Sequence, residues 1–181
     1  LSNPYYPKVL GELKVTGYSD YMHPYGEKHI IGIGKETIED ESGDFAWYQG
    51  VKISLFDISN ATNPQEIDKY IIGDRGTESP VLDDHKAFLF DRSKNLLVIP
   101  VSVAERPSGV PPWTYGTLVF QGAYVFNITL NGFVFRGRIT HSPSYVERSL
   151  YIDNVLYTIS GKKIKMNSLE TLEEINEIEL P

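Results

Sequence analysis

A short turn followed by an amphipathic strand recurs four times along this chain, and this repeat constrains the fold more than any single residue does. The turns are rich in Asn, Ser, Thr and Gly, and each leads into a run that mixes apolar and charged residues. The four copies span residues 1–15, 58–72, 128–139 and 167–180. Recurrence of one supersecondary unit is typical of folds in which each unit buries its apolar faces only against its neighbours.

Further strand patterns complete each unit. Residues 51–58, 122–128 and 163–166 precede the last three turns and form hairpins with the strands that follow them. Between these hairpins lie the strand-like runs 25–33, 87–99 and 149–159. Four short strands in every 40 to 60 residues or so are typical of β-propeller blades.

The sequence therefore predicts an all-β fold, a partial β-propeller of about three four-stranded antiparallel blades plus one extra strand. Residues 1–181 form a single domain, in which residues 1–16 are the outer strand of a preceding blade and residues 18–74, 78–140 and 144–181 are blades. The alternatives are a β-sandwich and, for residues 170–179, a C-terminal helix. Because propellers typically need four to eight blades, we expect a domain fragment of a longer protein, or self-association through open blade edges.

Composition agrees with a soluble β protein and excludes some functions. The chain contains 12 Tyr, 8 Phe, 15 Gly and 11 Pro, a balance that favours strands and turns. Its formal net charge of −7 argues against nucleic acid as a partner, because phosphate binding depends on Lys and Arg. Within this fragment, no apolar run is long enough to span a bilayer. The absence of Cys excludes thiol chemistry.

Four segments resemble the secreted β-propeller domain family of archaea and bacteria, which is distantly related to WD40 repeats. They are residues 18–36, 51–59, 84–90 and 122–126, in family order. The resemblance implies an exported, archaeal-type protein whose family is uncharacterised, and it supplies no catalytic residues.

The loops predict a binding face at one end of the blades. In a four-stranded meander, the connection between the second and third strands lies at the same end as the connection between blades. The two long connections between second and third strands, residues 34–50 and 103–117, contain both Trp residues. The connections between blades are rich in charged residues. The predicted ligand-binding face is Trp47, Tyr48, Arg75, Asp83, Asp84, His85, Trp113, Tyr115 and Glu147.

Three histidines, His23, His85 and His141, fall in successive connections between blades. If these connections converge on a central channel, the histidines are candidate metal ligands together with nearby carboxylates. Their spacing follows the blade repeat and matches no recognised ligand motif, so solvated or strand-start histidines are the competing interpretation. We expect no cofactor, with a divalent cation as the alternative.

Two acceptor triplets for N-glycosylation, at Asn60 and Asn127, are predicted on or near the opposite end. They agree with a secreted or cell-surface location, although Asn127 falls inside a predicted strand. Any signal or anchor is expected outside this fragment.

No catalytic motif was found, so the sequence predicts a non-enzymatic extracellular binding or scaffold module that presents its loop face to a protein or glycan. Two alternatives remain open. One is a metal-dependent hydrolase or lyase at the channel mouth, using Asp84, His85 and Glu147. The other is a purely structural domain that packs within a larger surface protein.

Overall fold

The computed structural model describes residues 3–181, and within that range the chain forms twelve β-strands and two short 3-10 turns. The strands are β1 (Tyr18–Pro24), β2 (His29–Glu39), β3 (Ala46–Asp57), β4 (Gln65–Ile72), β5 (Leu89–Asp91), β6 (Leu96–Glu105), β7 (Thr117–Thr129), β8 (Gly132–Thr140), β9 (Val146–Ile152), β10 (Val155–Ser160), β11 (Lys163–Ser168) and β12 (Glu174–Glu179). The 3-10 turns η1 (Pro80–Leu82) and η2 (His85–Ala87) lie between β4 and β5.

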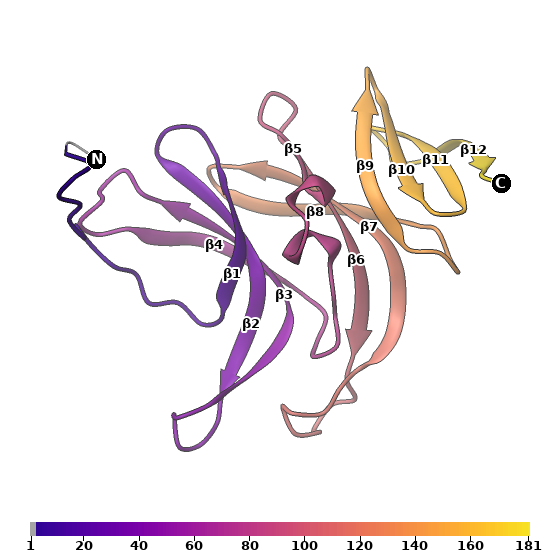
Figure 1. Ribbon diagram of the computed structural model, residues 1–181. Coiled ribbons are helices and arrows are strands. Elements are labelled where there is room, and N and C mark those ends of the chain that lie inside the picture. The colour runs from indigo at the N-terminus through magenta and orange to yellow at the C-terminus, as the bar shows by residue number, and fades with distance from the viewer. Residues whose placement is uncertain (1–2) are drawn as a thin grey trace.

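The strands form three four-stranded antiparallel sheets, each made of strands consecutive in the chain: β1 to β4, β5 to β8 and β9 to β12. Figure 1 shows the three sheets following one another from the N-terminal to the C-terminal end. Within each sheet, every strand pairs with the strands that precede and follow it in the chain, so each sheet is a simple meander. This confirms the predicted fold class, because three such sheets are consistent with a partial propeller.

Two apolar layers hold the sheets together. Between the first two sheets, Ile53 and Leu55 of β3 face Leu97 and Ile99 of β6. The alternate residues of β6, such as Val98, face the third sheet instead. Because β6 is buried on both faces, its sequence is a continuous apolar run rather than an alternating one.

Residues 3–17 do not form the predicted extra strand. This segment contacts the first sheet through hydrogen bonds that involve side chains and not through a backbone ladder. The Lys52 Nζ donates to the Thr16 carbonyl oxygen, and the Gly17 N–H donates to Thr37 Oγ1 at 2.8 Å. Residues 1 and 2 lie outside the described residues. That residues 1–16 belong to a preceding blade stays a prediction.

The predicted long loop at 34–50 is mostly an extended hairpin. The strand β2 continues to Glu39 and β3 begins at Ala46, so the connection is confined to residues 40–45. Backbone pairing tolerates polar residues where the β2–β3 hairpin extends beyond the apolar layer. The sequence of this hairpin therefore lacks the apolar pattern of a strand. In the second sheet the loop between β6 and β7 does remain long, covering residues 106–116.

The C-terminal residues form a strand rather than the alternative helix. In β12, Ile178 pairs with Ile164, and Glu177 pairs with Lys165. Glu174 and Glu177 also make ion pairs with Lys165 across the two strands. Opposite charges on directly facing strand positions favour the strand over a helix.

Candidate binding face

The centre of the candidate site is Arg75, which follows β4 in the connection to the second sheet. Only 7% of this residue is exposed. Its guanidinium carbon lies 4.4 Å from the centre of the Tyr48 ring, 4.5 Å from that of Tyr115 and 5.2 Å from that of Trp47. A guanidinium held between aromatic faces is stabilised by cation–π attraction. Arg75 is therefore part of the framework of the site rather than a free charge.

Hydrogen bonds tie this arginine to both neighbouring sheets. It donates from Nη1 to the Tyr48 carbonyl oxygen at 3.2 Å and from Nη2 to the Tyr115 hydroxyl at 3.3 Å. Its own carbonyl oxygen accepts from the Gly116 N–H at 2.7 Å. The planar fork of Arg can stack and donate at the same time, which Lys cannot do. Arg75 thus links the β2–β3 hairpin of the first sheet to the β6–β7 loop of the second.

The two aromatic segments come together because their hairpins extend to the same end of the molecule, as Figure 1 shows. The Trp47 and Trp113 rings lie 5.9 Å apart. The Gln49 side chain reinforces the junction, since its amide donates to the carbonyl oxygens of Trp47 and Pro112, each at 3.0 Å. We call Trp47, Tyr48, Arg75, Trp113 and Tyr115, with Phe45, the aromatic cluster.

Much of the cluster remains open to solvent. Trp113 is 54% exposed, Tyr115 60% and Tyr48 40%. Phe45, which sequence analysis did not select, is 53% exposed and packs edge-on against Trp47 at 4.7 Å. The signal that could have found it is its place two residues before Trp47, directly before β3, because alternate residues of an extended chain share a side. The cluster therefore combines a buried cationic centre with an exposed aromatic surface.

The two phenols of the cluster also interact. The hydroxyl groups of Tyr48 and Tyr115 are 3.4 Å apart. This hydrogen bond, followed by the positive charge of Arg75, lowers the pKa of Tyr115, whereas the same hydrogen bond raises the pKa of Tyr48. Arg75 favours the charged form of both phenols, so the shared hydrogen bond is what makes the two pKa values move in opposite directions.

Replacing Arg75 with Lys is expected to destabilise the protein by about 1–2 kcal/mol, because a Lys cannot reproduce the stacking and the paired hydrogen bonds. Urea unfolding followed by circular dichroism measures this loss. A matched control is Arg138→Lys, since Arg138 is exposed and lies 4.7 Å above the Phe120 ring. Equal losses of unfolding free energy in the two variants would contradict the role of Arg75 in linking the two sheets.

The remaining predicted face residues make other contacts. Asp84 caps η2 through the Lys86 N–H and forms an ion pair of 2.6 Å with Arg148 of β9. Asp83 and Glu147 are exposed, and His85 stacks beside Tyr21 with their ring centres 6.0 Å apart. The structure places these residues around β1, η2 and β9 and not in the aromatic cluster.

This environment gives little support to proton transfer by Asp84. The hydrogen bond from the Lys86 N–H, together with the charge of Arg148, lowers the pKa of its carboxyl group. A general acid or base works best with a pKa near the operating pH. The exposed ion pair is better explained as a link between η2 and the third sheet.

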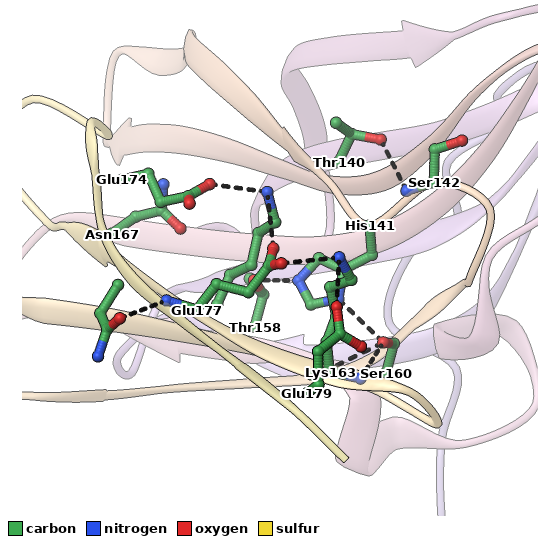
Figure 2. Close-up of polar contacts among 12 residues, drawn as sticks. Thr140, His141, Ser142, Thr158, Ser160, Lys163, Asn167, Glu174, Glu177 and Glu179 are labelled. Atoms are coloured by element: carbon green, nitrogen blue, oxygen red, sulfur yellow. Dashed lines mark hydrogen bonds and ion pairs between the residues drawn. The ribbon is translucent and has the colours of Figure 1, made fainter. Parts of the chain in front are cut away.

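The three candidate metal-binding histidines do not form one cluster, although His23 and His85 both lie beside the ring of Tyr21. His23 Nδ1 lies 2.8 Å from the Tyr21 hydroxyl, and its ring packs 5.0 Å from that of Phe88. His141 instead lies in the connection between β8 and β9 and contacts β10 of the third sheet, with Nδ1 3.0 Å from Ser160 Oγ and Nε2 2.8 Å from Thr158 Oγ1 (Figure 2). Across residues 3–181, no group of three or more His, Asp or Glu side chains is arranged to hold a metal ion. His141 is thus separated from the other two by its position against β10.

The two glycosylation acceptors differ in accessibility. Asn60 is exposed in the turn between β3 and β4, where its side-chain oxygen accepts from the Thr62 hydroxyl at 2.7 Å. Asn127 is half-buried within β7, between the paired residues Leu96 and Val134. Only the first has the position expected of an acceptor in a surface turn. Among the described residues, none of the helical segments has the length and apolar character to cross a membrane.

Comparison with known proteins identifies the family. The sequence model of a family described as "Beta propeller domain" matches residues 1–172. An uncharacterised protein of Methanocaldococcus jannaschii is 36% identical over 97% of this chain, and an uncharacterised protein of Archaeoglobus fulgidus is 31% identical over 99% of it. The chain spans less than a quarter of each relative, 22% and 23% respectively. The chain belongs to the Beta propeller domain family, as its three meander sheets and the match over nearly its whole length together show.

Proposed function

We propose that this chain is a non-enzymatic extracellular binding module whose ligand, a protein or a glycan, contacts the aromatic cluster. The observation that carries the proposal is an exposed aromatic surface built on a buried arginine. Trp113 and Tyr115 are more than half exposed, while Arg75 beneath them is 93% buried (7% exposed).

The chemistry of the cluster suits recognition. Tyr and Trp provide a large contact area at a low cost in side-chain entropy, and both are enriched at sites that dominate binding energy. The contacts to Arg75 and the packing of Trp47 against Trp113 hold the rings before a ligand arrives, which reduces the ordering cost of binding. Packing of the loops onto the sheets explains the buried side of the cluster, but it leaves the exposed ring faces of Trp113 and Tyr115 without a structural role.

An extracellular location is part of the same proposal. It is supported by the exposed acceptor triplet at Asn60 and by the resemblance to a secreted family. Detection of an attached glycan at Asn60, by mass spectrometry of protein purified from its native host, would support export of the chain.

Replacing Trp113 with Ala is expected to weaken ligand binding about tenfold or more, because an exposed Trp at the centre of such a surface contributes strongly to affinity. The measurement uses a glycan array and a panel of purified archaeal surface proteins, followed by titration of each hit. A matched control is Tyr6→Ala, since Tyr6 is 76% exposed on the N-terminal segment and lies outside the cluster.

The two substitutions distinguish the proposed site from general stickiness. Loss of binding in Trp113→Ala with retention in Tyr6→Ala would support the site. Equal binding by both variants and the unmodified chain, or no binding by the unmodified chain to any member of either panel, would contradict it.

A further inference from the structure

A polar cleft opens beside the aromatic cluster. Its volume is about 380 Å³, which lies within the range of about 300–1,000 Å³ that small-molecule sites occupy. Its lining includes Glu36 of β2, Gln49 of β3, Lys69 and Ile71 of β4, and Asp74 and Arg106 from the segments that follow β4 and β6. We call this space and its lining the polar cleft.

Two hydrogen bonds join the polar cleft to the aromatic cluster. The Gln49 amide donates to the Pro112 carbonyl oxygen, and Arg106 Nη1 donates to the Pro111 carbonyl oxygen, each at 3.0 Å. Trp113 follows directly in the chain, and more than half of it is exposed. A ligand held in the polar cleft can therefore extend onto the rings of the aromatic cluster.

Buried polar atoms without a hydrogen-bond partner gather at this junction. Of the seven such side-chain atoms among residues 3–181, three are Gln49 Oε1, Arg75 Nε and Arg106 Nε. Gln49 is only 4% exposed, and its Nε2 donates to the carbonyl oxygens of Trp47 and Pro112, so Oε1 is left as an unused acceptor. Unsatisfied buried polar groups cost stability and are rare in folded proteins. The junction therefore holds one acceptor and two donors that a ligand could satisfy.

The charges in the polar cleft are already paired. Lys69 Nζ lies 3.0 Å from Glu36 Oε2, and Arg106 Nη2 lies 3.6 Å from Asp74 Oδ1. The Asp74 carboxylate also accepts from the Arg106 backbone N–H at 2.8 Å. A charged ligand would have to compete with one of these ion pairs, whereas a hydroxyl can donate to a carboxylate or accept from a cation and leave the pairs intact. The pairing therefore favours a neutral ligand that is rich in hydroxyl groups.

We infer that the polar cleft binds the hydroxyl groups of a neutral sugar residue, and that the adjoining residue of the same glycan stacks on the aromatic cluster. Each hydroxyl both donates and accepts, so one sugar can satisfy the Gln49 acceptor and the Arg106 donor. The flat apolar faces of Trp113 and Tyr115 suit the C–H faces of a sugar ring. This inference rests on the proposed function and narrows its ligand to a neutral glycan.

The test fills the polar cleft by Ile71→Trp in the complete protein that contains this chain. Ile71 is 43% exposed on β4 and lines the cleft, so a larger side chain blocks the space without entering the apolar core. The probes are arrayed neutral di- and trisaccharides of glucose, galactose and mannose, with calorimetric titration of each one that binds. Ile71→Trp is expected to weaken their binding about tenfold or more, because several hydrogen bonds are lost together.

A control and a second variant make the comparison specific. Ile67→Trp is the matched control, because Ile67 is 39% exposed on the same strand outside the lining of the cleft, and it should leave the affinity unchanged. Arg106→Lys keeps a positive charge beside Asp74 but removes Nε, so the affinity is expected to fall about fivefold to tenfold, as for one lost hydrogen bond. Saccharides of uronic acids or glucosamine, matched in length, should bind more weakly than the neutral ones. Urea unfolding of each variant checks that it is folded.

Several results would overturn the inference. Unchanged affinity in Ile71→Trp, with a loss in Trp113→Ala, would do so and leave the proposed function standing. Tighter binding of the charged saccharides, or binding to the panel of surface proteins with no neutral saccharide bound, would have the same consequence. Unchanged affinity in Arg106→Lys would also count against it, because an ordered water would then account for the unpaired atoms. No binding to either panel would contradict the proposed function itself, and the inference with it.

Discussion

Replacing Phe126 with Ala is expected to lower the free energy of unfolding by about 3–5 kcal/mol, which is among the largest losses that a single core truncation causes. Phe126 lies on β7 and is 0% exposed. Its ring centre is 4.9 Å from that of Tyr70 on β4 and 5.7 Å from that of Phe135 on β8. The residue therefore joins the first sheet to the second, and truncation leaves a cavity between two rigid sheets that cannot close it.

The loss is measured by urea unfolding, with far-ultraviolet circular dichroism as the signal. A matched control is Phe45→Ala, because Phe45 is also aromatic but is 53% exposed at the tip of the β2–β3 hairpin. We expect the control to lose well under half as much stability. A Phe126→Ala protein as stable as the control would show that the first two sheets do not pack as described.

The second large effect is a fall in stability as the pH drops from about 6.5 to about 4, caused by His141. Burial, reinforced by the charges of Lys165 and Lys163, lowers the pKa of His141 from 6.5 to about 4. Glu177 and Glu174 act in the opposite direction but do not compensate. Both ring nitrogens lie within hydrogen-bonding distance of hydroxyls, those of Ser160 and Thr158, which suit a neutral imidazole.

The sign follows from proton linkage. Above pH 6.5 the imidazole is neutral in both the folded and the unfolded chain, so its full contribution to stability is present. Below pH 6.5 the unfolded chain binds a proton first, and stability falls until the folded chain also binds one near pH 4. The total contribution is about 2–3 kcal/mol.

The measurement is the free energy of unfolding between pH 7 and pH 4 for the unmodified chain and for His141→Gln. Carboxylates also titrate in this range, so the informative quantity is the difference between the two proteins. We expect this difference to shrink as the pH falls. His85→Gln is the matched control, because it makes the same replacement at an exposed histidine of η2. A difference that does not vary with pH would exclude proton binding by His141 as the cause.

The candidate site was partly predictable from the sequence. The order of strands in a meander places alternate connections at the same end, which is enough to associate Trp47 and Tyr48 with Trp113, Tyr115 and the connection that carries Arg75. That the arginine is buried between two tyrosine rings depends on how far each hairpin extends. Such extension is decided by backbone pairing between polar residues, which leaves no apolar pattern to recognise.

Other parts of the predicted face were not resolved by the same reasoning. Asp84 and His85 were grouped with the aromatic residues because both sets lie at one end of the blades. The structure instead pairs Asp84 with Arg148 of the third sheet and stacks His85 beside Tyr21 of the first. Strand order predicts at which end of a sheet a residue lies. It does not predict how far that residue lies from the other side chains at the same end.

The repeated unit of turn and strand predicted the three antiparallel sheets and their order, because these depend on local turn chemistry and on apolar periodicity. It also predicted a strand in its first copy, where residues 3–15 form none. Only the tertiary structure decided which contacts form between sheets. His141 is the clearest case, since its hydroxyl partners lie 17 and 19 residues further along the chain and meet it only when β8 and β10 pack together. Contacts between residues remote in sequence depend on how whole sheets twist and pack, which no local pattern of residues specifies.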